Sequence, residues 1–189
     1  LRCDELHPVI SGNKWFKLKF NLVQARRLGM TRIASFGGAW SNHLHALAFC
    51  AQQVGLESIG FVRGEELGAD ANPMLRDAAG WGMSLQFLAR QVYRERKVTV
   101  DAQTWLVPEG GDNEQGVLGC MTLIPAQRAL DYDAVLLPAG TGCTALGVRL
   151  ALPESTALWV APVLRDDTLQ QSWRARLQWQ PSEDESLNL

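Results

Sequence analysis

The stretch SFGGAWSNHLHALAFC, residues Ser35 to Cys50, joins an apolar segment to a helix-like segment through a glycine turn. The apolar run Thr31–Phe36 predicts a buried strand, and Gly37-Gly38 allow the backbone to turn sharply. Ser41 or Asn42 then either caps a following helix or binds an anion directly, because the start of a helix carries unpaired N–H groups. The stretch therefore predicts a strand, a turn and a helix with an edge suited to an anion.

Strands and helices alternate in the same way along the rest of the chain, with no internal repeat. Apolar runs and helical spacing predict strands over 58–62, 84–89, 104–107, 133–138 and 158–164, and helices over 14–28, 41–54, 73–81, 113–128 and 142–150. Pro125 is expected to disturb the end of its helix. This order predicts an α/β fold with mostly parallel, twisted sheets flanked by helices on both faces, followed by a loose tail over the last ten residues.

The composition argues against several classes of binding partner. Eighteen basic and twenty acidic side chains give a formal charge of −2, which offers no basic stripe for a nucleic acid. No apolar run approaches the roughly 20 residues of a membrane helix, and the start shows no signal-peptide pattern, so we expect a cytoplasmic protein. Four scattered cysteines without a CxxC pair are expected to be reduced thiols, and His43 and His45 are spaced wrongly for a helical metal site.

A second glycine turn follows a later predicted strand. It consists of Gly140, Thr141, Gly142, Cys143 and Thr144, and its hydroxyl groups and exposed amides are suited to a phosphate. It matches neither the dinucleotide fingerprint nor the P-loop, which needs a lysine. Either turn alone is better explained as an ordinary helix start than as a binding site.

Lys14 supplies a third element, since it opens a predicted helix directly after Gly12 and Asn13. The helix dipole and the nearby Lys17 and Lys19 disfavour its charged form, and a neutral amine forms an imine with a carbonyl. We expect Lys17 and Lys19 themselves to lie on the solvated face of the helix. A lysine and two anion-binding turns together suit pyridoxal phosphate joined to an amino acid.

The motifs SGNKWFKLKF, SFGGAWSNHLHALA, NPMLRDAAGWGM, PEGG and PAGTGCTALG resemble, in this order, the 1-aminocyclopropane-1-carboxylate deaminase and D-cysteine desulfhydrase family of fold type II pyridoxal-phosphate enzymes. The resemblance implies that Lys14 holds the cofactor and moves protons. It implies that Ser41, Asn42 and His43 face the substrate, with Asn42 also at the cofactor ring. It further implies that Gly140, Thr141, Gly142, Cys143 and Thr144 hold the phosphate.

The same resemblance implies two domains, a smaller one over 17–108 inserted in a larger one made of 1–16 and 109–189, and a homodimer. Family members usually continue beyond the end of this chain, in a portion that supplies the partner of the pyridine nitrogen and the tyrosines of the substrate pocket. Tyr93 and Tyr132 do not lie in a matching context, and the segment 93–105 is shorter than in relatives. Because the chain also begins at Leu1 without a methionine, we expect it to be a fragment or to lack some parts.

The leading functional hypothesis is a pyridoxal-phosphate deaminase or lyase acting on a small amino acid, of the 1-aminocyclopropane-1-carboxylate or D-cysteine type, that releases ammonia and a 2-oxo acid. A second hypothesis is a truncated, non-catalytic relative that binds the cofactor or a partner. A third is a nucleotide binder that uses the Gly140–Thr144 turn, although no acidic residue for a ribose is evident.

Overall fold

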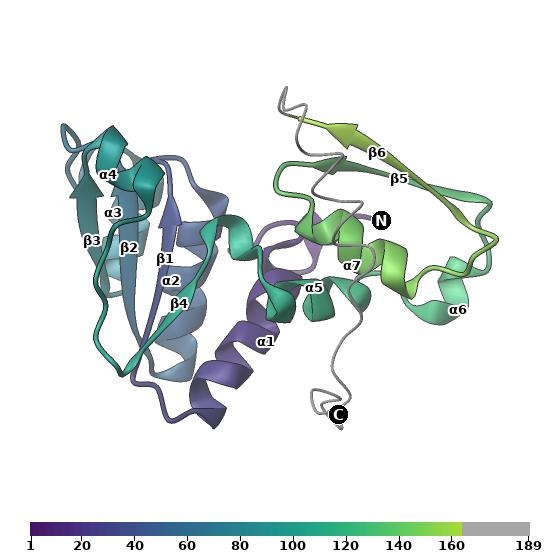
Figure 1. Ribbon diagram of the computed structural model, residues 1–189, viewed down its shortest axis with the longest axis horizontal. Helices are drawn as coiled ribbons and strands as arrows, with labels where there is room; N and C mark the ends of the chain where they lie inside the picture. The colour runs from purple at the N-terminus through teal and green to yellow at the C-terminus, as the bar shows by residue number, and fades with distance from the viewer. Residues whose placement is uncertain (164–189) are drawn as a thin grey trace.

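The structure, a computed structural model, describes residues 1–163, and strands alternate with helices through most of this range (Figure 1). The helices are α1 (Lys14–Arg27), α2 (Asn42–Val54), α3 (Pro73–Gly80), α4 (Arg90–Glu95), α5 (Glu114–Met121), α6 (Ala126–Ala129) and α7 (Cys143–Ala151), with short 3-10 turns η1 (Cys3–Glu5) and η2 (Glu109–Gly111). The strands are β1 (Arg32–Gly37), β2 (Glu57–Arg63), β3 (Met83–Leu88), β4 (Thr104–Val107), β5 (Ala134–Ala139) and β6 (Ala157–Pro162).

The first four strands form one sheet in the order β3-β2-β1-β4, and every pair in it is parallel. Side chains alternate between the faces of β1: Ile33 packs with α1, α2 and α3, whereas Ala34 and Phe36 pack with Phe61 and Tyr93 on the other face. Both faces of the sheet are therefore covered, which is the arrangement that parallel strands require.

The strands β5 and β6 form a second parallel pair, which Figure 1 shows beyond α7 from the larger sheet. Val135, Leu137 and Leu158 pack toward Val148 and Leu152 of the α7 region. On the opposite face Leu136 and Trp159, which are register partners, remain exposed. This sheet is therefore covered on one face by the part of the chain that the structure describes.

Three helices join the two sheets, because α5 packs against both α1 and α7. Glycines allow their close approach: a methyl group on Gly119 would lie 1.7 Å from the Phe16 carbonyl oxygen, and one on Gly147 would lie 2.5 Å from the Val117 carbonyl oxygen. Such contacts admit no side chain without movement of the backbone. The small residues of α5 and α7 thus hold the start of α1 beside the second glycine turn.

The predicted α/β fold with parallel sheets and helices is confirmed, with two differences in its elements. The helix predicted over 113–128 is two helices, because α5 ends at Met121 and Pro125, which cannot continue a helix, stands four residues later as the N-cap of α6. The polar helix α4 was not predicted, since its sequence RQVYRE has almost no apolar stripe. Leu164 and the predicted loose tail lie outside the described residues, and the division into two domains stays a prediction. Within residues 1–163, none of the helices has the length and apolar character needed to cross a membrane.

Candidate active site

The turn between β1 and α2 has the predicted form of a tight helix start. Ser41 is the N-cap of α2, and its hydroxyl accepts a hydrogen bond of 3.2 Å from the Leu44 N–H. Gly37 has no room for a side chain, because a methyl group there would lie 2.4 Å from Ser41 Oγ. Asn42, the first residue of α2, is exposed at this edge. The turn leaves the N–H groups of Asn42 and His43 unpaired within the helix, where an anion is favoured.

The turn between β5 and α7 has the same architecture. Gly142 is the N-cap of α7 with φ of 87°, a conformation that favours glycine, and Cys143 and Thr144 begin the helix. The Thr141 hydroxyl oxygen is buried and has no hydrogen-bond partner among the described residues. A buried polar atom without a partner is costly, so this hydroxyl is suited to an acceptor or donor supplied by a ligand.

Lys14 is linked to this second turn through the side chain of Asn13, its neighbour in the sequence. The Lys14 ammonium donates a hydrogen bond of 2.6 Å to Asn13 Oδ1, and Asn13 Nδ2 donates one of 2.7 Å to Thr144 Oγ1. The predicted lysine and the predicted phosphate turn therefore lie together, although they are far apart in the sequence.

The pKa of Lys14 is lowered from 10.5 to about 8, as the sequence predicted in direction. Burial is the largest cause and the positive charge of Lys17 is the second, whereas the thiols of Cys120 and Cys143 act in the opposite direction. The sequence argument gave the helix dipole and the neighbouring lysines as causes and did not foresee the burial. About a tenth of Lys14 is therefore an uncharged amine at pH 7, and about half at pH 8.

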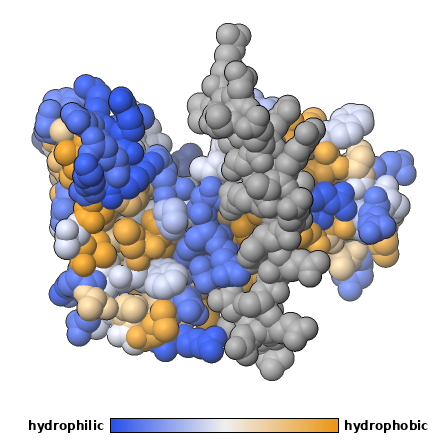
Figure 2. All heavy atoms as spheres, in the orientation of Figure 1, coloured by the Kyte–Doolittle hydropathy of each residue, from blue (hydrophilic) through white to orange (hydrophobic). Residues whose placement is uncertain are grey.

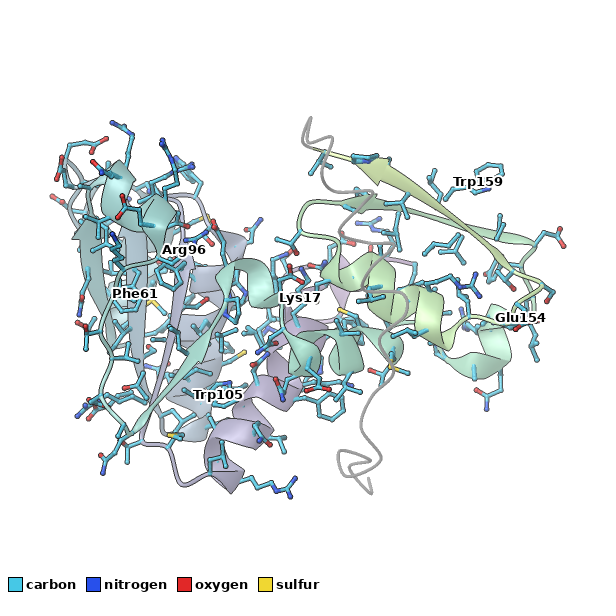
Figure 3. All side chains as sticks on the ribbon, in the orientation of Figure 1. Lys17, Phe61, Arg96, Trp105, Glu154 and Trp159 are labelled. Carbon is cyan, nitrogen blue, oxygen red and sulfur yellow. The ribbon has the colours of Figure 1, made fainter. Side chains whose placement is uncertain are left out.

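Lys17 does not lie on a solvated helix face, and that expectation is wrong. Lys17 is only 6% exposed, and Figure 3 shows its position between the two sheets. A methyl group on Gly110 would lie 3.9 Å both from Lys17 Nζ and from the Thr141 hydroxyl oxygen. Within residues 1–163 no carboxylate lies within 4 Å of its ammonium. A cation on a largely buried residue, with no carboxylate at hand, suggests a site for an anion. Lys19 is half-buried and donates to the Thr122 hydroxyl.

His43 is buried beneath the first turn rather than exposed at it. Its Nε2 lies 2.9 Å from Ser35 Oγ, and Ser35 in turn donates to the Pro108 carbonyl. Its Nδ1 is buried without a hydrogen-bond partner among the described residues. Burial, followed by the charges of Lys17 and Lys14, lowers the pKa of His43 to about 3, so its ring is neutral at physiological pH.

Two buried thiols, those of Cys120 and Cys143, also lie at the second turn. Cys143 Sγ donates to the Gly111 carbonyl at 3.3 Å, and Cys120 Sγ lies 3.8 Å from Thr144 Oγ1. The hydrogen bond between the two cysteines, followed by burial, raises the pKa of Cys143, so this residue is a neutral thiol. Cys143 therefore serves the turn through its backbone and its packing rather than as a charged group.

The structure brings Lys14, Cys143, Thr144 and the unpredicted Lys17 into one region. Ser41 belongs to the wall of a separate cavity of about 840 Å³, whose lining includes neither Lys14 nor the second turn. No group of three or more His, Cys, Asp or Glu side chains suited to a metal ion occurs within residues 1–163. Sequence reasoning missed Lys17, and its only signal was its spacing three residues after Lys14.

The fold is that of the fold type II pyridoxal-phosphate enzymes. A solved structure described as a 1-aminocyclopropane-1-carboxylate deaminase homologue superposes with a TM-score of 0.71 at 21% identity, covering 92% of this chain and 58% of that chain. At this identity the likeness shows the fold alone.

Curated relatives confirm the resemblance to the 1-aminocyclopropane-1-carboxylate deaminase and D-cysteine desulfhydrase family. A Thermotoga maritima protein provisionally named as the deaminase is 27% identical over 79% of this chain and 52% of its own length. A bifunctional D-cysteine desulfhydrase/1-aminocyclopropane-1-carboxylate deaminase of Arabidopsis thaliana is 24% identical over 75% of this chain and 41% of its own length. The nocardicin C-9′ epimerase of Nocardia uniformis is 34% identical over 80% of this chain and 51% of its own length. No family model matches the sequence.

The chain spans about half the length of the curated relatives that it matches. Because those relatives include proteins named as deaminases and an epimerase, the comparisons show the fold and leave the cofactor and the reaction to be inferred from the site.

Proposed function

We propose that this chain binds pyridoxal phosphate through Lys14 and belongs to a deaminase or lyase that acts on a small amino acid. The observation that supports the proposal most directly is the hydrogen-bonded path from Lys14 through Asn13 to Thr144, which ties an amine of lowered pKa to an anion-binding turn. An aldehyde cofactor with a phosphate needs these two features at one place.

The residues at the second turn fit a phosphate group. The backbone N–H groups that open α7 would hold it, together with the unpartnered Thr141 hydroxyl and the ammonium of Lys17, a residue that is only 6% exposed. A phosphate would satisfy the hydroxyl and offset the buried positive charge, two groups that the described residues leave unmatched. Asn42 would lie against the ring, and Cys143 would contribute only its backbone N–H.

Pyridoxal phosphate, when bound, supplies a carbonyl for imine formation and a ring that accepts electrons from the carbon beside the substrate amine. The chain supplies the acid–base groups. Lys14, held by Asn13 Oδ1, is uncharged often enough near pH 8 to attack a carbonyl, with loss of water. Once the substrate amine has displaced it, the free Lys14 amine would accept a proton from that carbon. The unpaired N–H groups at the start of α2 would bind the substrate carboxylate beside Ser41.

The experiment is to mix the purified protein with pyridoxal phosphate, record the imine absorption band, and fix the adduct with borohydride. Peptide mass mapping is expected to find the label on Lys14, and Lys14→Ala is expected to lose it. Lys19→Ala, on the same helix, is the matched control and should keep the label. Labelling at Lys17 or at a surface lysine in the wild type would refute the assignment.

A substrate panel then tests the reaction class by measuring ammonia, sulfide and 2-oxo acid from small amino acids in both enantiomers. Release of ammonia with a 2-oxo acid supports a deaminase or lyase. Inversion of the α-carbon without ammonia, detected by chiral chromatography, would instead identify an epimerase. An imine on Lys14 with neither product would favour a non-catalytic relative.

A further inference from the structure

The cavity beside Ser41 is lined by charged groups that the mechanism above does not use. It opens between the turn after β1 and the helix α4, and Figure 2 shows hydrophilic residues gathered over the α4 end of the molecule. The charged side chains that line it are Arg63, Arg90, Arg94, Arg96, Glu66 and Glu109. Four guanidinium groups against two carboxylates give the lining a formal charge of +2, which favours an anionic ligand.

The two carboxylates are already paired. Glu66 receives a hydrogen bond of 2.6 Å from Arg90, while Glu109 forms an ion pair with Arg96 and also accepts a hydrogen bond of 2.6 Å from the Tyr93 hydroxyl. Within residues 1–163 Arg63 has no carboxylate within 4 Å. Arg94 has none in this range either, so the surplus positive charge of the lining lies at Arg63 and Arg94.

Arg96 is held in place before any ligand arrives. It is the one non-glycine residue of the described chain with positive φ, at 54°, and it ends α4 in the left-handed conformation. Its guanidinium lies 4.3 Å from the ring centre of Tyr93 and 4.7 Å from that of Phe36, and Figure 3 shows it beside the larger sheet. Such backbone conformations cost energy and occur where a side chain must be aimed.

Arg63 faces the same aromatic ring. Its guanidinium carbon lies 5.8 Å from the centre of Tyr93, so two cations share one ring while only Arg96 has a carboxylate. Like charges near each other favour the binding of an anion that contacts both. Arg63 also lies close to the first turn, because a methyl group on Gly38 would be 3.7 Å from Arg63 Nη2.

We infer that the substrate is an amino acid that carries a second anionic group, a carboxylate or a phosphate, on its side chain. The inference rests on the proposed function, in which the α-carboxylate binds at the start of α2. Ser41 lies on the wall of the same cavity as Arg63 and Arg96. A substrate anchored at that wall extends its side chain into a space of about 840 Å³, where Arg63 lies close to Gly38 of the same turn and has no carboxylate within 4 Å among the described residues.

The test compares anionic amino acids with neutral amino acids of similar size. With pyridoxal phosphate bound, kcat/KM for either enantiomer of aspartate or O-phosphoserine is expected to exceed that for asparagine or serine by about tenfold or more. The comparison of aspartate with O-phosphoserine decides between a carboxylate and a phosphate. Arg63→Gln should remove most of this preference and leave the neutral amino acids unchanged.

Arg27→Gln is the matched control, since Arg27 is exposed on the last turn of α1 and does not line the cavity. It should keep the wild-type preference. If kcat/KM in Arg63→Gln falls equally for anionic and neutral amino acids, Arg63 binds the α-carboxylate instead, and the inference is overturned. Equal kcat/KM for the two groups in the wild type would overturn it as well.

A binding measurement separates this inference from the proposed function. Calorimetric titration of the protein without cofactor is expected to show that succinate binds about tenfold more tightly than butyrate, with Arg63→Gln removing the difference. If that result holds while no imine forms on Lys14, the anion site stands and the proposed function fails. If Lys14 is labelled but succinate and butyrate bind alike, the function stands and the anion site is refuted.

Discussion

The side-chain amide of Asn13 donates a hydrogen bond of 2.7 Å to the Thr144 hydroxyl, across 131 positions of the chain. The same side chain accepts from Lys14 through its carbonyl oxygen, so one residue orients both the amine and the turn. The Asn13 amide donates through its nitrogen and accepts through its oxygen, and no other residue type of this size can do both in the same way.

Asn13→Ala is expected to weaken binding of pyridoxal phosphate by about tenfold, because Lys14 and Thr144 each lose their partner. Stability should fall by about 1 kcal/mol, the ordinary value of such a hydrogen bond. A titration followed at the imine band and a urea melt measure the two effects. Gln52→Ala, an exposed change on α2, is the control, and an unchanged cofactor affinity in Asn13→Ala would show that the path has no role in binding.

Ser41 both caps α2 and is predicted to face the substrate, and two substitutions separate these roles. Ser41→Ala loses the bond to the Leu44 N–H and is expected to cost about 0.5–2 kcal/mol, whereas Ser41→Gly costs only a few tenths. Turnover should fall in both variants while the Lys14 imine band persists. If turnover in Ser41→Gly equals that of the wild type, the hydroxyl is a helix cap and nothing more.

Thr141 and Thr144 are expected to respond in opposite ways to replacement by valine. Thr141→Val removes a buried hydroxyl without a partner, so the protein without cofactor should be unchanged or slightly more stable, while its affinity for pyridoxal phosphate falls. Thr144→Val breaks the bond from Asn13 and should destabilise the protein even without cofactor. Thermal melts with and without pyridoxal phosphate test both. Destabilisation of the cofactor-free protein by Thr141→Val would contradict a hydroxyl reserved for the phosphate.

The pKa of Lys14, about 8, predicts how cofactor attachment depends on pH. The rate of imine formation should rise with pH through a midpoint of about 8 and then level off, as the amine loses its proton. Lys17→Gln removes a neighbouring positive charge that lowers the pKa of Lys14, so the midpoint should move to higher pH. Lys97→Gln, at the surface, should leave it in place. A midpoint that stays fixed or moves down in Lys17→Gln would contradict this arrangement.

The lowered pKa of Lys14 also makes the stability of the folded protein depend on pH. Because the pKa of Lys14 is lower in the folded protein than its ordinary value of 10.5, the unfolded chain binds the extra proton between these two values. The contribution of Lys14 to stability therefore rises as the pH increases from about 8 toward 10.5, and it is constant below this window. Lys14→Met should lack this rise in urea melts taken across the window.

Gly119 tests whether the close approach of α1 and α5 holds the site together. Gly119→Ala would place a methyl group 1.7 Å from the Phe16 carbonyl oxygen and is expected to cost about 1–3 kcal/mol or more. Gly80→Ala meets nothing within 4 Å in α3 and is expected to stabilise the protein by about 0.4–1 kcal/mol. Urea melts of both variants check the prediction, and equal stabilities would contradict it.

Local signals in the sequence were sufficient for the strands, most of the helices and the two glycine turns. Alternating or continuous apolar runs mark β1 and β2, and Gly55 and Pro73 mark a helix end and a helix start through backbone conformations that are set locally. Lys14 was singled out because it follows Gly12 and Asn13 and begins a helix. The sequence motifs also indicated the fold family, which the relatives confirm.

The tertiary structure decided the environment of the lysines and the charge of the cavity. The periodicity of α1 places Lys17 on a basic face, but Lys17 is buried because α5 packs against α1 and because Gly111 comes so close that a methyl group there would lie 3.0 Å from Lys17 Cβ. Burial then lowers the pKa of Lys14, since removing water disfavours the ammonium form. Arg63 and Arg96 belong to different elements and meet only over the Tyr93 ring. A sequence gives the identity of a side chain, whereas its solvation and its charged neighbours depend on contacts between distant segments.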